Sequence, residues 1–256
     1  MSEAIDPRTP GAPAVASPER RRLFRRIALV PLAVAGGAGL PRSVAQTPPT
    51  TAPNSQGQRP APGEPYRPVF FSADEWRFLE AACERLIPHD AHGPGALESG
   101  VPEFMDRHMQ TPYAAGDIWY TQGPYLDAPS TFGYQGRLPL RDILRVGIAA
   151  TDGHCRRAFA GRAFAQLSEP EQVDTLGGLE KGTIELPDIS VTVFFGYLLS
   201  ETRNGYFADP SHGGNRNMGG WKMIGYPGVR ADYLDWVTVR DRPYPIAPVD
   251  MSGRRG

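Results

Sequence analysis

One stretch of the chain, residues 209–228, concentrates side chains that could bind a small anion. Asp209, His212, Arg216 and Lys222 stand there among closely spaced glycines. Arginine and lysine recognise anions, and glycine allows close approach of one backbone to another. Three interpretations follow: a substrate or small-anion site, a rigid loop that packs on its own domain, or a surface that receives a protein partner.

Two other groups of residues could do chemistry, but their spacing is unfavourable. His89 and His92 flank Asp90 with ligand types that suit zinc. They follow a predicted helix and have no further ligand pair nearby, which favours a solvated helix end. His154 precedes Cys155, yet adjacent residues of a helix do not face each other. We therefore predict no catalytic residue and no metal-binding residue.

Cofactor fingerprints are also missing from the sequence. The Gly213-Gly214 pair lacks the third glycine and the strand–helix setting of a dinucleotide-binding turn. Neither cysteine belongs to a C-x-x-C-H motif, which excludes a haem attached through paired thioethers. We expect this chain to bind no cofactor by itself.

The first 45 residues have the three-part layout of a removable export signal. A run of arginines precedes an uncharged apolar stretch over residues 27–40. A small-residue pattern then predicts cleavage between Ala45 and Gln46. The apolar stretch is shorter than the roughly 20 residues of a membrane-spanning helix. An uncleaved leader that acts as an anchor is the alternative.

The arginines of this leader indicate the export route. Arg21 and Arg22, with Phe24 two residues on, match the twin-arginine pattern. Arg20 and Arg25 depart from the full consensus. Twin-arginine export carries folded proteins, often with a cofactor or a bound partner. We expect a periplasmic protein that passes through the twin-arginine translocon.

Charge and composition limit what the remaining chain can be. The whole chain has 27 basic and 28 acidic residues, and residues 1–45 hold more of the basic ones than of the acidic ones. The rest is mildly acidic and lacks the basic stripe of a nucleic-acid binder. Residues 46–68 read as a flexible, Pro-rich linker. Residues 69–256 are then long enough for one domain with its own core.

The elements that must position the 209–228 segment are helices. Ser72 and Ser168 each open a capping box, and Asp188 is the expected cap of a last core helix that stops at Asn204-Gly205. No strong period-two pattern occurs. We predict a mainly α fold, a small helical bundle with long ordered loops rich in glycine and aromatic residues. Helical spacing of apolar residues covers the ranges 72–87, 104–109, 139–161, 168–176 and 188–204.

The two cysteines, Cys83 and Cys155, leave three possibilities open. Both lie on largely apolar helix faces, so they could be small buried side chains. They could pair with each other if their helices pack side by side. Cys155 precedes Arg156 and Arg157, which suggests a position near the surface. It could therefore bridge to a partner protein.

The C-terminal segment carries a resemblance. The patterns D-P-x-x-G-G-N-R over 209–216 and G-W-K-x-I-G-Y-P-G over 220–228 are similar to the signature of the gluconate 2-dehydrogenase subunit 3 family. The E-R-L-I-P run at 84–88 and the V-P-E-F run at 101–104 are similar as well. The likeness extends from Phe70 to Gly228.

The resemblance implies that this chain is a subunit that does not itself catalyse a reaction. Members of this family are small subunits of periplasmic sugar and sugar-acid dehydrogenases. A large GMC-type flavoprotein subunit holds FAD and oxidises the substrate, and a multihaem cytochrome c subunit can pass the electrons to membrane quinones. The small subunit carries the export signal and helps the flavoprotein fold and cross the membrane. The complex is then membrane-associated through its partner subunits.

Two classes of function therefore compete. In the first, the chain is an accessory subunit whose C-terminal signature faces the flavoprotein, with Trp221 and Arg216 as types enriched at interfaces. In the second, it is a free-standing enzyme or small-anion-binding protein that uses the same segment. The expected partner-facing residues are Asp209, His212, Gly213, Gly214, Asn215, Arg216, Trp221 and Lys222.

Overall fold

A computed structural model describes residues 66–118, 122–126, 128–230 and 232–256. The described residues contain seven α-helices and no strand beyond isolated bridges, so the mainly α prediction is confirmed. None of these helices has both the length and the apolar character needed to cross a bilayer. The described fold starts at Tyr66, inside the predicted linker.

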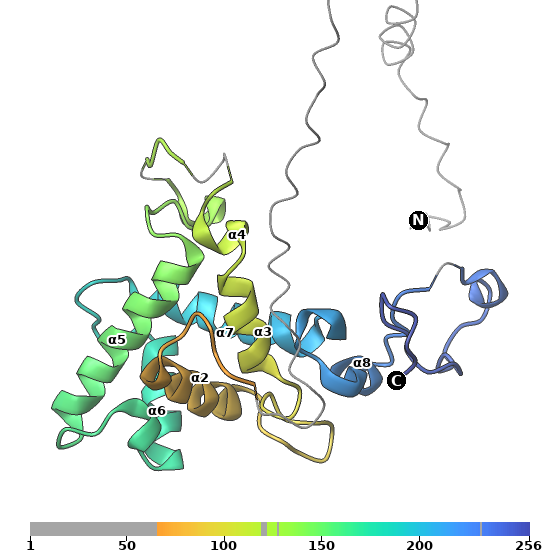
Figure 1. Cartoon of the computed structure of the whole chain (residues 1–256), viewed down its shortest axis with the longest axis horizontal. Helices are drawn as coiled ribbons and strands as arrows, with labels where there is room; N and C mark the ends of the chain where they lie inside the picture. The colour runs from red at the N-terminus through yellow and green to blue at the C-terminus, as the bar shows by residue number, and fades with distance from the viewer. Residues whose placement is uncertain (1–65, 119–121, 127, 231) are drawn as a thin grey trace, which may run out of the picture. The chain divides into compact units, whose positions relative to one another are not determined.

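Five of the seven described helices lie close to their predicted positions, and the two short ones at Pro112–Ala115 and Gly219–Ile224 were not predicted. The capping boxes at Ser72 and Ser168 are both formed. The predicted cap at Asp188 is wrong, because the last long helix starts after Ser190. The α-helices, coloured along the chain in Figure 1, are α2 (Ala73–Leu86), α3 (Val101–Met109), α4 (Pro112–Ala115), α5 (Leu140–Ala158), α6 (Glu169–Glu180), α7 (Val191–Phe207) and α8 (Gly219–Ile224).

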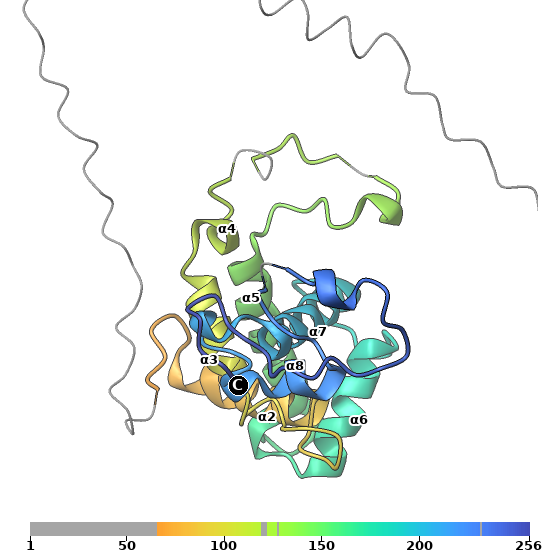
Figure 2. The same cartoon turned by 90° about the vertical axis from the view of Figure 1, so that its right-hand side faces the viewer.

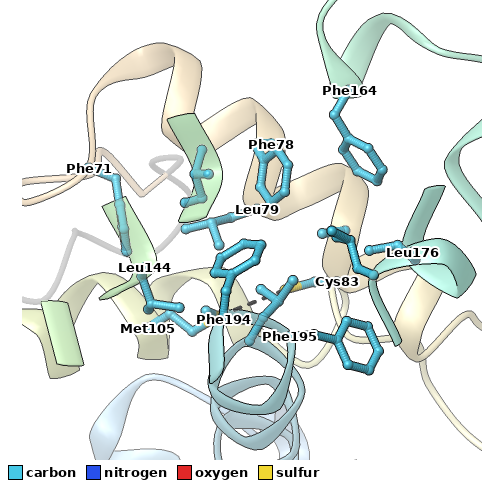
Figure 3. Close-up of a cluster of buried hydrophobic side chains, with 14 of the residues drawn as sticks. Phe71, Phe78, Leu79, Cys83, Met105, Leu144, Phe164, Leu176, Phe194 and Phe195 are labelled. Carbon is cyan, nitrogen blue, oxygen red and sulfur yellow. Dashed lines mark hydrogen bonds between the residues drawn. The ribbon is translucent and has the colours of Figure 1, made fainter. Parts of the chain in front are cut away.

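Helix α7 is the element around which the others pack. It contacts α2, α3, α5, α6 and α8, and Figure 2 shows it among them. Phe194 and Leu198 on this helix are completely buried. The ring of Phe194 lies near Phe78 of α2, which itself packs on Phe164, as Figure 3 shows. The core is therefore built of aromatic and aliphatic side chains that converge on one helix.

The buried face of α2 differs in part from the prediction. Leu79 and Cys83 are in the core as expected, and Phe78 joins them. Trp76 falls at the same helical spacing as Leu79 and Cys83, but it is only half-buried, and its ring packs on Tyr66. The aromatic segment before the helix thus covers Trp76, and Phe78 occupies the core position instead.

A buried carboxylate on α3 holds the chain segment that leads into α2. Asp106 is fully buried. Its Oδ1 accepts hydrogen bonds from the backbone N–H groups of Phe70 (3.0 Å) and Phe71 (2.9 Å). Its Oδ2 accepts from Val69 N–H (2.9 Å) and from the Tyr66 hydroxyl (2.7 Å). Burial and this carboxylate raise the pKa of Tyr66, so the tyrosine keeps its proton and remains the donor.

We predict that Asp106→Asn strongly destabilises the domain. An amide has only one acceptor oxygen, so at least two of the buried donors would face an NH₂ group. Unsatisfied buried donors cost about 1–3 kcal/mol each, and we expect a loss of about 3 kcal/mol in the free energy of unfolding. Chemical denaturation of the purified chain measures it.

Asp174→Asn is the matched control, because Asp174 is an exposed aspartate on α6. We expect it to change stability by less than about 0.5 kcal/mol. Equal stabilities of the two variants would contradict the role assigned to Asp106.

Candidate functional site

The predicted 209–228 loop is partly helical. Single turns of 3-10 helix cover Pro210–His212 and Arg216–Met218, and α8 follows directly. Helix α7 runs on to Phe207, so the predicted stop at Asn204-Gly205 is wrong. Gly205 is instead a buried helical residue packed against Phe104 of α3.

Two side chains of the segment complete the end of α7. The last carbonyl groups of a helix have no partner within the helix and need one elsewhere. Trp221 donates its indole N–H to Phe207 O at 2.8 Å. Asn215 donates from Nδ2 to Ala208 O at 2.9 Å, and its Oδ1 accepts from Gly220 N at 2.9 Å. Asn215 thereby joins the end of α7 to the start of α8.

Glycine is required where this segment meets the last turn of α7. A Cβ atom on Gly214 would lie 2.1 Å from the carbonyl oxygen of Gly205, and one on Gly220 would lie 2.5 Å from that of Tyr206. Real side chains do not tolerate such contacts with backbone atoms. The two glycines therefore let the segment lie directly against the helix.

Arg216 is held by the neighbouring helix α3. Its guanidinium pairs with Glu103, whose other oxygen takes Arg107 at 2.6 Å. Glu103 is nearly buried, and the Arg216 backbone N–H donates to Ser99 O at 3.1 Å. The guanidinium is therefore already engaged by a carboxylate that it shares with Arg107, which weakens its case as the centre of an anion site.

The remaining predicted interface residues divide into two groups. Asp209 is used internally, because its carboxylate accepts from Ser211 N and from Met251 N at 2.9 and 2.8 Å. His212 and Lys222 are exposed, and their side chains make no hydrogen bond or ion pair within the described part of the chain. Of the eight predicted residues, these two have exposed side chains that are not already engaged within the described part of the chain, whereas Arg216 is exposed but paired with Glu103.

Trp221 is placed differently from the expectation. Only 5% of it is exposed, and its ring edge packs on Tyr226 at 5.2 Å between centroids. Its indole nitrogen is taken by α7, so both its apolar area and its hydrogen-bonding group are used within the domain. In this arrangement the side chain stabilises the segment and does not present itself to a partner.

The remaining residues that the sequence singled out form no chemical site in the described part of the chain. His89 is exposed and lies 3.0 Å from Glu98, and the described residues hold no group of three or more potential metal ligands. A His–carboxylate contact that the sequence did not suggest joins α3 to α7, with His108 Nδ1 2.6 Å from Glu201 Oε2. A cavity of about 500 Å³ lies beside α5, and no predicted site residue lines it. The leader residues Arg21, Arg22, Phe24, Ala45 and Gln46 lie outside the described residues.

Both cysteines are unpaired and buried. Cys83 Sγ lies 3.8 Å from Met105 Sδ and from Thr202 Oγ1. Cys155 is also completely inaccessible, although Arg156 and Arg157 beside it are exposed. This placement favours the interpretation as small core side chains, and a bridge from Cys155 to a partner would need the thiol to leave the core.

We predict that neither thiol reacts in the native chain. Burial raises the pKa of Cys83 to about 12 and that of Cys155 to about 11. The thiolate is the reactive form, so alkylation by iodoacetamide at about pH 8 should be slow for the folded chain and rapid after unfolding. Mass spectrometry counts the modified residues. Rapid native alkylation of Cys155 would contradict its burial and revive the bridge.

A second prediction concerns the indole of Trp221. Trp221→Phe keeps an aromatic ring but leaves Phe207 O without a donor, so we expect a loss of about 1–2 kcal/mol in the free energy of unfolding. Trp236→Phe is the control, because Trp236 is half-buried outside this segment. Unchanged stability of Trp221→Phe, together with weaker binding to a partner, would assign the indole to an interface.

The part of the chain that matches a known family corresponds to the helical domain described above. The family model for gluconate 2-dehydrogenase subunit 3 matches residues 73–228, which is more than half of the chain. The match begins with the first residue of α2 and ends just after α8. No curated protein and no solved structure matches the chain. On this match, the chain belongs to the gluconate 2-dehydrogenase subunit 3 family.

Proposed function

We propose that this chain is the non-catalytic small subunit of a periplasmic FAD-dependent dehydrogenase that oxidises a sugar, a sugar acid or a polyol. Its task is to assist the folding of a GMC-type flavoprotein subunit and to carry that subunit through the twin-arginine translocon. FAD then belongs to the large subunit, and haem c to a cytochrome subunit where one is present.

The family match over residues 73–228 is the observation that carries this proposal. It makes the chain a relative of a named dehydrogenase subunit. The leader with Arg21 and Arg22 adds the export function. A chain that supplies the export signal to a partner must bind that partner before translocation, because this route carries folded proteins.

The use of polar groups in the signature also fits an accessory role. Asn215, Arg216 and Asp209 are engaged in holding α3, α7 and the C-terminal segment together. A catalytic site needs a nucleophile, a base and a group that orients the base in mutual contact. The contacts of these three residues explain them as residues that stabilise the fold.

The competing class, a free-standing enzyme or an anion-binding protein, makes a different prediction for the purified chain. Assays of the isolated chain with gluconate and other sugar acids, with a dye as electron acceptor, separate the two classes. The accessory role predicts no turnover until the flavoprotein subunit is added. Turnover by this polypeptide alone would contradict it.

We predict that changing both Arg21 and Arg22 to Lys retains the whole complex in the cytoplasm. The twin-arginine pattern depends on this pair, so the flavoprotein should stay behind together with the unprocessed chain. Dehydrogenase activity and immunoblots of periplasmic and cytoplasmic fractions measure the distribution. The control is Arg25→Lys, which conserves charge at a position that already departs from the pattern.

The outcome distinguishes export by this chain from export by the partner. Activity that is retained in the cytoplasm with Arg21→Lys/Arg22→Lys, but not with the control, supports the proposal. Activity that reaches the periplasm with both variants would show that the flavoprotein crosses the membrane by another signal, and the escort role would be wrong.

A further inference from the structure

The chain after α8 forms a projecting loop, here called the C-terminal arm, over residues 229–249. Its two ends are joined, because Val229 N donates to Val249 O at 2.8 Å and Val249 N donates to Pro227 O at 3.2 Å. Arg230 adds a hydrogen bond to Ala247 O at 2.7 Å. Figure 1 shows the arm in dark blue beyond α8, away from α5 and α6.

The arm exposes its apolar side chains. Leu234 is 79% exposed and Val237 is 70% exposed. No large apolar side chain described after Trp221 is buried. Covering such side chains with a partner would be favourable, since burial of apolar area lowers the free energy. The exposed apolar residues of the arm and its base are Met223, Ile224, Tyr226, Val229, Tyr233, Leu234, Val237, Val239, Ile246 and Met251.

Aromatic contacts fix the shape of the arm without burying its apolar surface. Tyr244 lies at the centre, with Tyr233 at 5.8 Å and Trp236 at 5.5 Å between ring centroids. The guanidinium of Arg230 lies over the Tyr244 ring at 5.1 Å. A binding loop that is already ordered loses less conformational entropy when it docks. The arm is thus preorganised to present its apolar tip.

The charges of the arm indicate what kind of surface it fits. It carries three arginines and three aspartates, so its net charge is zero. Asp235, Arg240 and Arg242 make no hydrogen bond or ion pair within the described residues. Attachment to an anionic membrane uses a surplus of cations, which the arm lacks. An apolar centre with unpaired charges of both signs at its edge is typical of a protein–protein interface.

We infer that the C-terminal arm is the docking element for the flavoprotein subunit and decides which large subunit this chain accepts. The inference rests on the proposed function. The arm begins where the family match ends, at residue 228, so it adds to the part of the chain that the family shares. Charge complementarity assigns the partner a groove with an apolar floor, basic groups facing Asp232 and Asp235, and acidic groups facing Arg240 and Arg242.

The test is the affinity of the full chain for the FAD-containing large subunit of the proposed complex. Leu234→Ser combined with Val237→Ser removes the apolar tip. We expect a dissociation constant about tenfold or more higher, as for the central residues of an interface. Val173→Ser is the control, because Val173 is a 54% exposed valine on α6, and it should leave the affinity within about twofold. Circular dichroism should show the same helix content for all three proteins, since the arm contributes nothing to the core.

A second variant tests the charge assignment separately. Arg240→Glu combined with Arg242→Glu should slow association and change its dependence on salt, because edge charges act mainly on the rate of encounter and the reversed charges would repel the acidic groups of the partner. The wild-type chain should bring flavin absorbance with it through gel filtration, and the Leu234/Val237 variant should bring less.

Each outcome decides the matter. Unchanged affinity of both arm variants, with a normal wild-type complex, overturns the arm as docking element and leaves the proposed function intact. Absence of any complex between wild-type chain and flavoprotein overturns both. The Leu234/Val237 variant could also keep its affinity for the flavoprotein and lose another interaction. Loss of binding to anionic phospholipid vesicles would then assign the arm to a membrane, and loss of a homodimer would assign it to a second copy of the chain.

Discussion

The carbonyl groups at the end of α7 are the constraint on which the signature segment depends. Helix α7 packs against nearly every other long helix. Its last turn is partly buried, because Gly205 and Tyr206 are covered whereas Phe207 is exposed, and its last carbonyl groups have no partner within the helix. Trp221 and Asn215 supply the missing donors. Once these two side chains are committed, the path of the chain from Ala208 to α8 is determined, and glycine is needed where that path crosses the helix backbone.

Backbone groups at the start of the domain are also satisfied by a side chain from a distant part of the sequence. Asp106 accepts hydrogen bonds from the backbone N–H groups of the segment before α2. This segment belongs to no helix that could supply acceptors for them. Glu103, one turn earlier on α3, holds Arg216 of the signature. Helix α3 therefore links the start of the domain to its C-terminal segment through two carboxylates. His212 and Lys222 of the signature and much of the C-terminal arm stay exposed beside this arrangement.

The extent to which the sequence predicts this structure follows from the range of the interactions. Ser72 and Glu75, three residues apart, each accept a hydrogen bond from the other's backbone N–H, so the local sequence is enough to predict the start of α2. The end of α7 is not readable in this way, because Trp221 reaches back 14 residues. Asn204-Gly205 has the composition of a helix stop, but buried packing of Gly205 against α3 keeps it helical. Asp106 looks like any surface aspartate until its donors, 35 or more residues earlier, are brought to it. The family signature was recognisable from its residues, whereas the inward contacts of Asn215 and Trp221 required the fold.

In the proposed complex, the chain is divided into a signature that maintains the domain and an exposed surface that meets the flavoprotein. Hydrogen–deuterium exchange of the chain, alone and bound to the flavoprotein, tests this division most directly. The Gly220 amide donates to Asn215 Oδ1 at 2.9 Å within the isolated domain. We therefore expect it to be protected already in the free chain. Amides of residues 240–247 donate no hydrogen bond within the described part of the chain, so they should gain protection only in the complex. Rapid exchange at Gly220 in the free chain, with protection that appears only on binding, would contradict the account and make the signature itself the interface.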